Sequence, residues 1–446
     1  MKNEEAIYDV KNLGKGKIVV LGLQHMFAMF GATVLVPIIT GLSVSATLLF
    51  AGIATLFCHF VTKHKVPVFL GSSFAFLGGY AAVKATAVAA GYTEQEGLVY
   101  ASVGVAIAGL LYLVLSGICK AYGSKKVMKF YPPIVTGPII IAIGMNLAPS
   151  AINNCEANWT IAIIAILAVL ICNIWGKGMI KIIPILIGVL ASYLCAILFD
   201  AASREAVVSA VSQAKWFGLP VEGKNTVFSL FGNCDGNLLV SSVITIVPIA
   251  FATMMEHVGD ISAISSTVGK NFIEDPGLHR TLIGDGIGTT IAALFGAPAN
   301  TTYGENTGVL ALTKIYDPFV IKLAAIYAIV LSFCPKFAAL ITAMPAATIG
   351  GVSLILYGMI SAVGIRNMVE NNTDFQESRN VIIAALIIGL AIGITYSSAG
   401  AIAIGSVSLS GLAVASIVGI ILNIVLPDKD ADSKGGFFKK KSTGGL

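Results

Sequence analysis

Residues Ala297–Ala311, APANTTYGENTGVLA, form an apolar segment that is interrupted by small polar residues and contains a carboxylate. Pro298 predicts an extended stretch, Gly304 predicts a break in the backbone, and Glu305 opens a short apolar helix. A second segment at Val66–Gly79, VPVFLGSSFAFLGG, has the same order of proline, small polar residues and apolar helix. Corresponding interrupted segments in the two halves of a chain are typical of transporters built from inverted repeats.

The composition is that of a membrane protein. The 446 residues are 56% hydrophobic, with a mean hydropathy of +0.88, and only 11% are charged, against roughly 25% in soluble domains. Apolar runs near the spanning length of about 20 residues follow one another from Ile18 to Val425. The N-terminal residues lack the features of a signal peptide. We therefore expect an all-α polytopic membrane protein with no separate soluble domain.

Charge in the loops predicts the topology. With the N-terminus in the cytoplasm, the even-numbered loops are cytoplasmic and basic, and the C-terminal Lys439–Lys441 lies on the same side. This asymmetry supports fourteen spans. Their predicted starts are near Ile18, Ser43, Val68, Leu98, Pro133, Trp159, Ile180, Leu238, Thr281, Pro298, Pro318, Met344, Val381 and Ala401.

A second pair of similar segments supports the repeat. YPPIVTGPIIIAIGMN and MPAATIGGVSLILYGM both run from a proline to a glycine five residues later, Pro132 to Gly137 and Pro345 to Gly350. Seven spans in each half is an odd number, so the halves would insert in opposite orientations. The interrupted segments would then face each other near mid-membrane, with unpaired N–H groups around a central site. The alternative is that these glycines and prolines only kink closely packed helices.

Ionisable residues inside predicted spans are candidates for function because burying each is unfavourable unless it is paired or faces water. They are His25, Glu256, His257, Asp260, Asp285 and Glu305. Glu256 and Asp260 are four residues apart and share a helix face, whereas His257 points elsewhere. With Glu305 they form a set suited to ring N–H donors and to holding a proton. The alternative is a structural cluster, and we expect Asp285 at the membrane interface.

Four residues besides the carboxylates have expected roles. Phe74 and Tyr303 would place aromatic rings beside the two half-helices, ready to stack on a planar ligand or to pack. His25, preceded by Gln24, would either bind substrate or orient the broken segments, and we favour the second. No P-loop, HExxH or clustered Cys/His motif is present, so no metal site or cofactor is expected.

The seven cysteines have no metal-ligand spacing. Five lie in or at the ends of apolar runs and are interpreted as packing residues. The other two, Cys155 and Cys234, lie in predicted outer loops, where a disulfide between them is possible.

These motifs resemble a known family. ENTGVLALTK, from Glu305 to Lys314, resembles the signature of the nucleobase-cation symporters, also called nucleobase-ascorbate transporters. QHMFAMFGATVLVP, GSSFAF, EHVGD, DPGLHR and NTTYGEN are similar to segments of bacterial uracil permeases in the same order, from about Leu21 to Gly419. The resemblance implies two inverted repeats of seven spans, extended stretches in spans 3 and 10, and a homodimer.

The resemblance also implies a division into core and gate domains. The implied divisions are an N-terminal cytoplasmic tail (1–17), core spans 1–4 (18–119), gate spans 5–7 (120–201), an extracellular loop (202–237), core spans 8–11 (238–335), gate spans 12–14 (336–427) and a C-terminal cytoplasmic tail (428–446).

For the site, the resemblance implies that uracil is held by Glu256, Glu305, Phe74 and Gly304, and that Tyr303, Asp260 and Tyr357 line the pocket. Glutamate at 305, where purine transporters usually have glutamine, favours uracil. Asp260 stands where the proton-coupled uracil permease has histidine, so Asp260 and Glu256 are the expected proton-coupling residues, with His25 and Gln24 supporting. Assistance to sodium binding by Asp260 is the other reading.

The resulting hypothesis is a secondary active uracil importer of the cell membrane, coupled to protons more readily than to sodium, and not an enzyme. Besides uracil, the expected partners are the coupling cation, membrane lipid and a second subunit, and no nucleic acid. The alternative within the family is a xanthine or urate permease. An anion transporter of the same seven-plus-seven architecture is less favoured, because such proteins usually present basic or neutral residues at the broken helices, and a membrane enzyme is a distant third.

Overall fold

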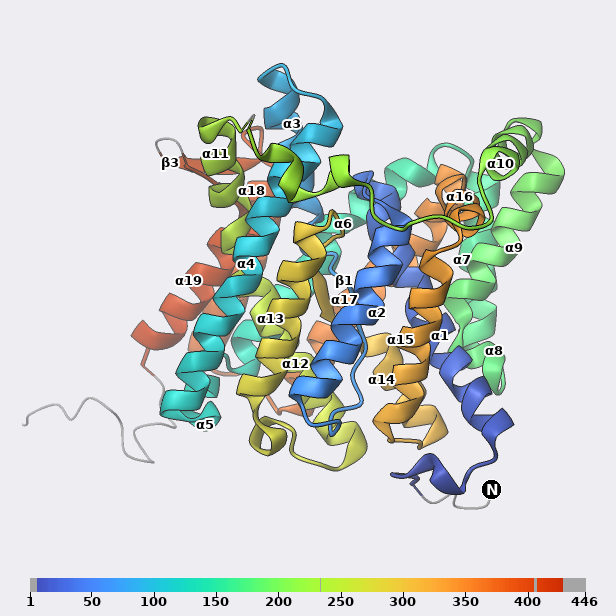
Figure 1. Cartoon of the computed structure of the whole chain (residues 1–446). Helices are drawn as coiled ribbons and strands as arrows, with labels where there is room; N and C mark the ends of the chain where they lie inside the picture. The colour runs from blue at the N-terminus through green and yellow to red at the C-terminus, as the bar shows by residue number, and fades with distance from the viewer. Residues whose placement is uncertain (1–5, 233, 405–406, 428–446) are drawn as a thin grey trace, which may run out of the picture.

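The computed structural model describes residues 6–232, 234–404 and 407–427 and is mostly helical (Figure 1). The predicted C-terminal tail and its Lys439–Lys441 lie outside these ranges. The α-helices are α1 Lys15–Thr40, α2 Val44–Val61, α3 Leu77–Ala89, α4 Glu94–Tyr122, α5 Ser124–Val127, α6 Pro133–Cys155, α7 Trp159–Ile174, α8 Met179–Ile182, α9 Pro184–Phe199, α10 Ala201–Gln213, α11 Gly236–Ile246, α12 Ala250–Val268, α13 Leu278–Leu294, α14 Gly304–Thr313, α15 Pro318–Ser332, α16 Pro335–Thr342, α17 Ala346–Glu370, α18 Ser378–Thr395 and α19 Gly411–Val425.

Four short strands and six helical turns complete the described elements. The strands are β1 Leu70–Ser72, β2 Asn300–Thr302, β3 Ala401–Ile404 and β4 Val407–Ser410. The turns are η1 Val10–Asn12, η2 Met128–Phe130, η3 Gly223–Asn225, η4 Val227–Leu230, η5 Val247–Ile249 and η6 Ile273–Gly277.

Within the described ranges, seven helical segments are long and apolar enough to cross a membrane, and the count rises to nine if each of two bent pairs is one span. The bent pairs are α9 with α10, at 107°, and α15 with α16, at 90°. Most predicted starts agree with helix starts to within a few residues. The prediction near Ala401 was wrong, because β3 and β4 pair as an antiparallel hairpin and α19 begins only at Gly411. Alternation in AIAI and VSLS is a strand pattern that the hydropathy count overlooked.

The two interrupted segments meet at the centre of the fold, as predicted. Strands β1 and β2 are antiparallel, with Leu70 opposite Thr302, Gly71 opposite Thr301 and Ser72 opposite Asn300. This register is symmetric, since a half-turn about Gly71 and Thr301 exchanges the strands. The pairing also satisfies backbone groups that would otherwise be unpaired at this depth.

A threonine from a neighbouring helix hydrogen-bonds the backbone of each strand. The Thr55 hydroxyl of α2 accepts from Leu70 N at 2.9 Å and donates to Leu70 O at 3.2 Å. The Thr289 hydroxyl of α13 makes the same two contacts with Asn300, at 3.1 and 3.2 Å. Leu70 and Asn300 occupy equivalent positions in the symmetric register. The same pair of threonine–backbone hydrogen bonds in both halves supports an internal repeat.

The second predicted repeat pair forms a close helix contact. A Cβ on Gly137 of α6 would lie 3.0 Å from the Gly364 carbonyl oxygen of α17, and a Cβ on Gly350 of α17 would lie 2.8 Å from the Ala151 carbonyl oxygen of α6. These glycines therefore allow α6 and α17 to pack backbone against backbone.

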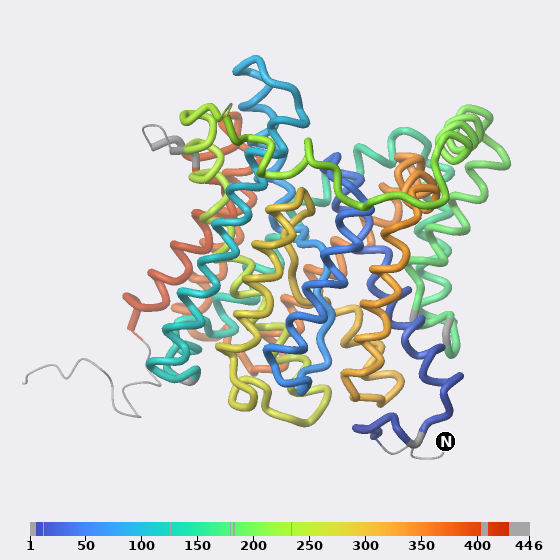
Figure 2. The backbone as a smooth tube through the Cα atoms, viewed as in Figure 1, coloured from blue at the N-terminus to red at the C-terminus, as the bar shows by residue number. Residues whose placement is uncertain are grey.

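Most helices run roughly parallel to one another, and the start of α1 lies at the end opposite α10, α11 and α16 (Figure 1). The long connection between α10 and α11, which contains η3 and η4, crosses the end of the molecule formed by α10, α11 and α16 (Figure 2). The outward-facing side chains of α7 are exposed and apolar, as expected of a helix that faces lipid. Cys155 is buried, Cys234 is exposed and both are free, so the possible disulfide between them is absent.

Candidate functional site

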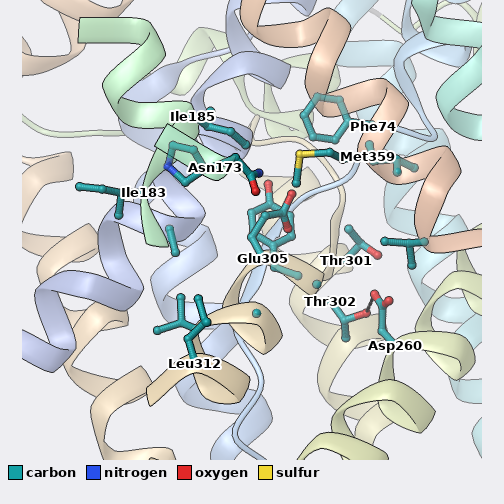
Figure 3. A pocket seen from close by; sticks show the side chains of 18 of the residues that line it. Phe74, Asn173, Ile183, Ile185, Asp260, Thr301, Thr302, Glu305, Leu312 and Met359 are labelled. Atoms are coloured by element: carbon teal, nitrogen blue, oxygen red, sulfur yellow. Dashed lines mark hydrogen bonds between the residues drawn. The ribbon is translucent and has the colours of Figure 1, made fainter. Parts of the chain in front are cut away.

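A cavity of about 310 Å³ lies beside the strand pair and is lined by five of the six predicted substrate-binding residues: Phe74, Glu256, Tyr303, Gly304 and Glu305. Asp260 also lines it. Figure 3 shows Glu305 at its centre, with Phe74 on one side and Thr302 and Asp260 on another. Its volume is at the lower end of the range for small-molecule sites, which suits a compact ligand.

Helix α12 presents two carboxylates to this cavity. Glu256 is half-buried, and its Oε2 atom has no hydrogen-bond partner within the described part of the chain. Asp260, one turn later, accepts a hydrogen bond of 2.5 Å from the Thr302 hydroxyl at the end of β2. The helical spacing places both side chains on one face, as predicted. Glu256 is therefore available to a ligand, whereas Asp260 is tied to the interrupted segment.

The third carboxylate belongs to the first turn of α14. The backbone is extended at Tyr303, which precedes the helix, and helical from Gly304. Glu305 is half-buried and lines the cavity. The first N–H groups of a helix have no intrahelical acceptor, and the N-terminal end of the dipole is positive. Acceptor atoms of a ligand and the Glu305 carboxylate can therefore share this end of α14.

Phe74 and Tyr357 form an aromatic pair, and only Phe74 lines the cavity. Their ring centroids are 5.7 Å apart at 75°, an edge-to-face contact. Tyr357 is 1% exposed and does not belong to the lining residues. The prediction that Tyr357 lines the pocket was therefore wrong. Its ring supports Phe74 from behind, because α17 packs it against the segment that joins β1 to α3.

The Tyr303 ring is directed to the other strand. Its hydroxyl donates to the Ser72 carbonyl oxygen at 2.9 Å. A Cβ on Gly71 would lie 2.4 Å from the ring, so the ring covers the backbone of β1. Stacking of a planar ligand between matched Phe74 and Tyr303 rings is thus not supported, since Tyr303 fastens the strands together.

His25 and Gln24 of α1 lie outside the cavity lining. His25 is fully buried, and its carbonyl oxygen accepts from Asn306 Nδ2 of α14 at 3.0 Å. The same amide nitrogen lies 3.2 Å from His25 Nδ1. Both contacts reach α14, so the favoured reading of His25, that it orients a broken segment, agrees with its position. Gln24 is likewise buried in α1.

Asp285, which was expected at the membrane interface, is enclosed by protein. It is 0% exposed, and its Oδ2 atom lies 2.8 Å from His257 Nδ1. The other ring nitrogen of His257 lies 2.9 Å from the Thr281 hydroxyl. Helix α13 packs against α2 and α4, which surround Asp285 with protein. His257 points away from the cavity, as its position next to Glu256 predicted.

Thr302 and Thr301 are two of the polar cavity residues that the sequence reasoning missed, and Asn173, Lys181 and Arg366 are others. Thr302 holds Asp260, and Thr301 has a buried hydroxyl without a partner among the described atoms. Both belong to the NTT of β2 quoted above, but strand alternation predicts opposite directions for neighbouring side chains, so the pattern gave no signal that both would line one cavity. Within the described ranges no cluster of three or more His, Cys, Asp or Glu side chains is arranged to hold a metal ion.

Comparison with known proteins assigns the family. A family model described as "Permease family" matches residues 16–400. The uracil permease of Bacillus caldolyticus is 37% identical over 436 residues, covering 96% of each chain. The chain belongs to this permease family, the nucleobase transporters. The uracil permease of Escherichia coli K12 is 37% identical to this family member, over 91% of this chain and 90% of that protein. A putative pyrimidine permease of the same organism, RutG, is 35% identical over 93% and 90%.

Solved structures show the fold of this permease family member. The transmembrane domain of the cyanobacterial bicarbonate transporter BicA has a TM-score of 0.58 at 15% identity, over 94% of this chain and 99% of that one. The structure of SLC26A9 has a TM-score of 0.59 at 10% identity, over 94% of this chain and 66% of that one. The permease thus shares the seven-plus-seven inverted-repeat transporter fold.

Proposed function

We propose that the protein imports uracil across the cell membrane by proton symport. The observation that carries this proposal is the meeting of Glu256, Asp260 and Glu305 around one cavity at the crossing of two interrupted segments. Relatives named uracil permease, at 37% identity over most of the chain, support the substrate.

The chemistry of uracil matches this arrangement. Its two ring N–H groups are donors that suit carboxylate acceptors, and Glu256 and Glu305 line the cavity from different helices. Its two carbonyl oxygens are acceptors that suit the N–H groups at the starts of α3 and α14 near Phe74 and Gly304. Phe74 would pack on the planar ring. Tyr303 and Tyr357 act indirectly, by holding the strands and by supporting Phe74.

Asp260 and Glu256 are the proposed proton-coupling residues. Asp260 takes the position of the usual histidine, and its bond to Thr302 joins α12 to the interrupted segment that continues into α14. Protonated carboxyl groups would favour loading from outside, and proton loss inside would favour release of substrate. A change of charge at Asp260 would therefore alter its hydrogen bond to Thr302, and with it the position of the segment that carries Glu305.

Transport would proceed by movement of a core domain, spans 1–4 and 8–11, against a gate domain, spans 5–7 and 12–14. The fourteen-span count includes the shorter helices α3, α7, α13, α14 and α19 together with the strand segments. Residues of both proposed domains line the cavity, among them Glu305 from the core and Ile185 and Met359 from the gate. We propose cytoplasmic termini and a homodimer, as in the family.

Uracil uptake by purified protein in proteoliposomes, under separately imposed proton and sodium gradients, tests this proposal. Accumulation is expected with an inward proton gradient and not with a sodium gradient at equal pH. Accumulation with sodium alone would contradict proton coupling, and no saturable uptake under either gradient would contradict the substrate. Competition by excess xanthine would distinguish the family alternative, a xanthine or urate permease, because a pyrimidine site should be little affected by a purine.

A further inference from the structure

The residues that precede α1 do not extend away from the molecule. Residues 6–13, here called the N-terminal arm, lie beneath α14 and α15 at the N-terminal end of the molecule (Figure 1). Val10 of the arm is 3% exposed and belongs to the same hydrophobic cluster as Val268 and Leu310. Because this apolar side chain is buried in the hydrophobic core, the arm is a packed part of the fold.

The arm satisfies the last carbonyl groups of two helices. The Tyr8 hydroxyl donates to the carbonyl oxygen of Val268, the last residue of α12, at 2.8 Å. The Ile7 N–H donates to the carbonyl oxygen of Lys314, directly after α14, at 2.9 Å. Carbonyls at helix C-termini have no intrahelical donor, so each contact replaces a missing one.

Additional contacts fix the arm in place. Tyr316 N–H donates back to the Ile7 carbonyl at 2.7 Å, which completes a parallel bridge between Ile7 and Ile315. The Tyr8 ring lies 5.4 Å from the Tyr316 ring, and Lys270 Nζ lies 4.4 Å from the Tyr8 ring centroid. Tyr8 therefore touches the chain after α12 and the chain after α14 at once.

The two helices joined by the arm are those that carry the glutamates. Glu256 lies about 18 Å along α12 from Val268, at a rise of 1.5 Å per residue. Glu305 lies about 12 Å along α14 from its last residue. Since α14 is a half-helix of ten residues, its orientation depends on what holds its ends. Its first end is fixed by the strand pair and its last end by the arm.

We propose that the N-terminal arm is a brace that sets the spacing of Glu256 and Glu305, with Tyr8 as its positioning residue. The substrate readout rests on the proposed function, because it measures uracil binding and transport. Loss of the Tyr8 side chain would free the ends of α12 and α14 and broaden the distance between the glutamates. The consequence is weaker binding of substrate by a protein that is still folded.

The first experiment compares uracil uptake by the full-length variants Tyr8→Ala, Tyr8→Phe and Tyr122→Ala in proteoliposomes. We expect Tyr8→Ala to raise KM about fivefold with a maximal rate within twofold of the unmodified protein. Tyr8→Phe keeps the ring contacts and loses only one hydrogen bond, so KM should rise about twofold. Tyr122, 67% exposed at the end of α4, is the matched control and should have no effect. An unchanged KM in Tyr8→Ala would overturn the proposal.

The second experiment does not depend on uracil. Hydrogen exchange of the same variants, followed by mass spectrometry, should become faster in the last turns of α12 and α14 in Tyr8→Ala, and remain unchanged in α6. Faster exchange confined to residues 6–13 would overturn the brace, because the helix ends would then not depend on it. If the unmodified protein takes up no uracil, the proposed function fails while this measurement still decides the brace.

Discussion

Two clusters of ionisable side chains flank α12, and only one of them faces the cavity. Glu256 faces the cavity, and its Oε2 atom has no hydrogen-bond partner in the part of the chain that the structure describes. His257, the next residue, faces away from the cavity, and its two ring nitrogens contact Asp285 and Thr281. Neighbouring residues on one helix thus belong to an open cluster and a sealed cluster. Asp285 Oδ1, like Glu256 Oε2, is buried without a hydrogen-bond partner among the described atoms, so a carboxylate in a membrane span indicates a ligand site only where it also faces a cavity.

The sealed cluster has a defined proton arrangement. The Thr281 hydroxyl donates to the Leu278 carbonyl at 3.0 Å, so it accepts from His257 Nε2. A proton must then also lie between His257 Nδ1 and Asp285 Oδ2, which are 2.8 Å apart. Whether nitrogen or oxygen carries this proton, the His257–Asp285 pair has no net charge, which lowers the free-energy cost of burying the pair. The open cluster has three carboxylates that line one cavity, which suits a site that binds N–H donors and protons.

The largest effect is expected from breaking the sealed cluster. Asp285→Leu leaves His257 without its partner, and removal of one member of a buried ion pair typically costs about 3 kcal/mol or more. We expect a clear fall in melting temperature and in the yield of folded protein, measured by size-exclusion fluorescence after heating. The control is Asp275→Leu, which removes a surface ion pair with Lys65 whose Asp275 side chain is 71% exposed. Equal melting temperatures for the two variants would mean that the cluster does not stabilise the fold.

The opposite result is expected for the open cluster. Glu305→Gln replaces an acceptor by a group that presents an amide donor, and a hydrogen bond to a charged group is worth about 1.5–3 kcal/mol. We expect uracil uptake at low concentration to fall about 100-fold while the melting temperature stays within a few degrees. Glu205→Gln, on the exposed face of α10, is the control. Unchanged uptake by Glu305→Gln would remove this residue from the substrate site.

This contrast also explains how far the sequence could predict the site. Spacing placed Glu256 and Asp260 on one face, and the matched interruptions placed Glu305 opposite them, because helix period and backbone breaks are local properties. The position of Asp285 depends on which helices surround α13, and no local pattern contains that information. The same limit applies to Tyr357, whose residue type suits a pocket but whose position behind Phe74 is set by the packing of α17 on α6.

A smaller effect is expected where the open cluster joins the strand pair. Thr302→Val removes the hydroxyl that donates to Asp260 at 2.5 Å and keeps the side-chain volume. Loss of one such bond to a carboxylate corresponds to about 1.5 kcal/mol, or roughly a 10-fold fall in uptake driven by a proton gradient. Thr302→Ser keeps the hydroxyl and should retain most of the activity. If valine and serine variants transport equally, the bond to Asp260 has no part in coupling.

The smallest effect is expected when the threonine-to-valine substitution is made in the sealed cluster, at Thr281 instead of Thr302. Thr281→Val removes the acceptor of His257 Nε2, which leaves a buried donor unsatisfied at a cost of about 1 kcal/mol or somewhat more. We expect a small fall in melting temperature, and uptake per folded molecule within twofold of the unmodified protein, with Thr281→Ser restoring the melting temperature. Thr281 and Thr302 would then differ in kind, one acting on stability and the other on transport. A 10-fold loss of uptake in folded Thr281→Val would instead show that transport depends on the His257–Asp285 pair.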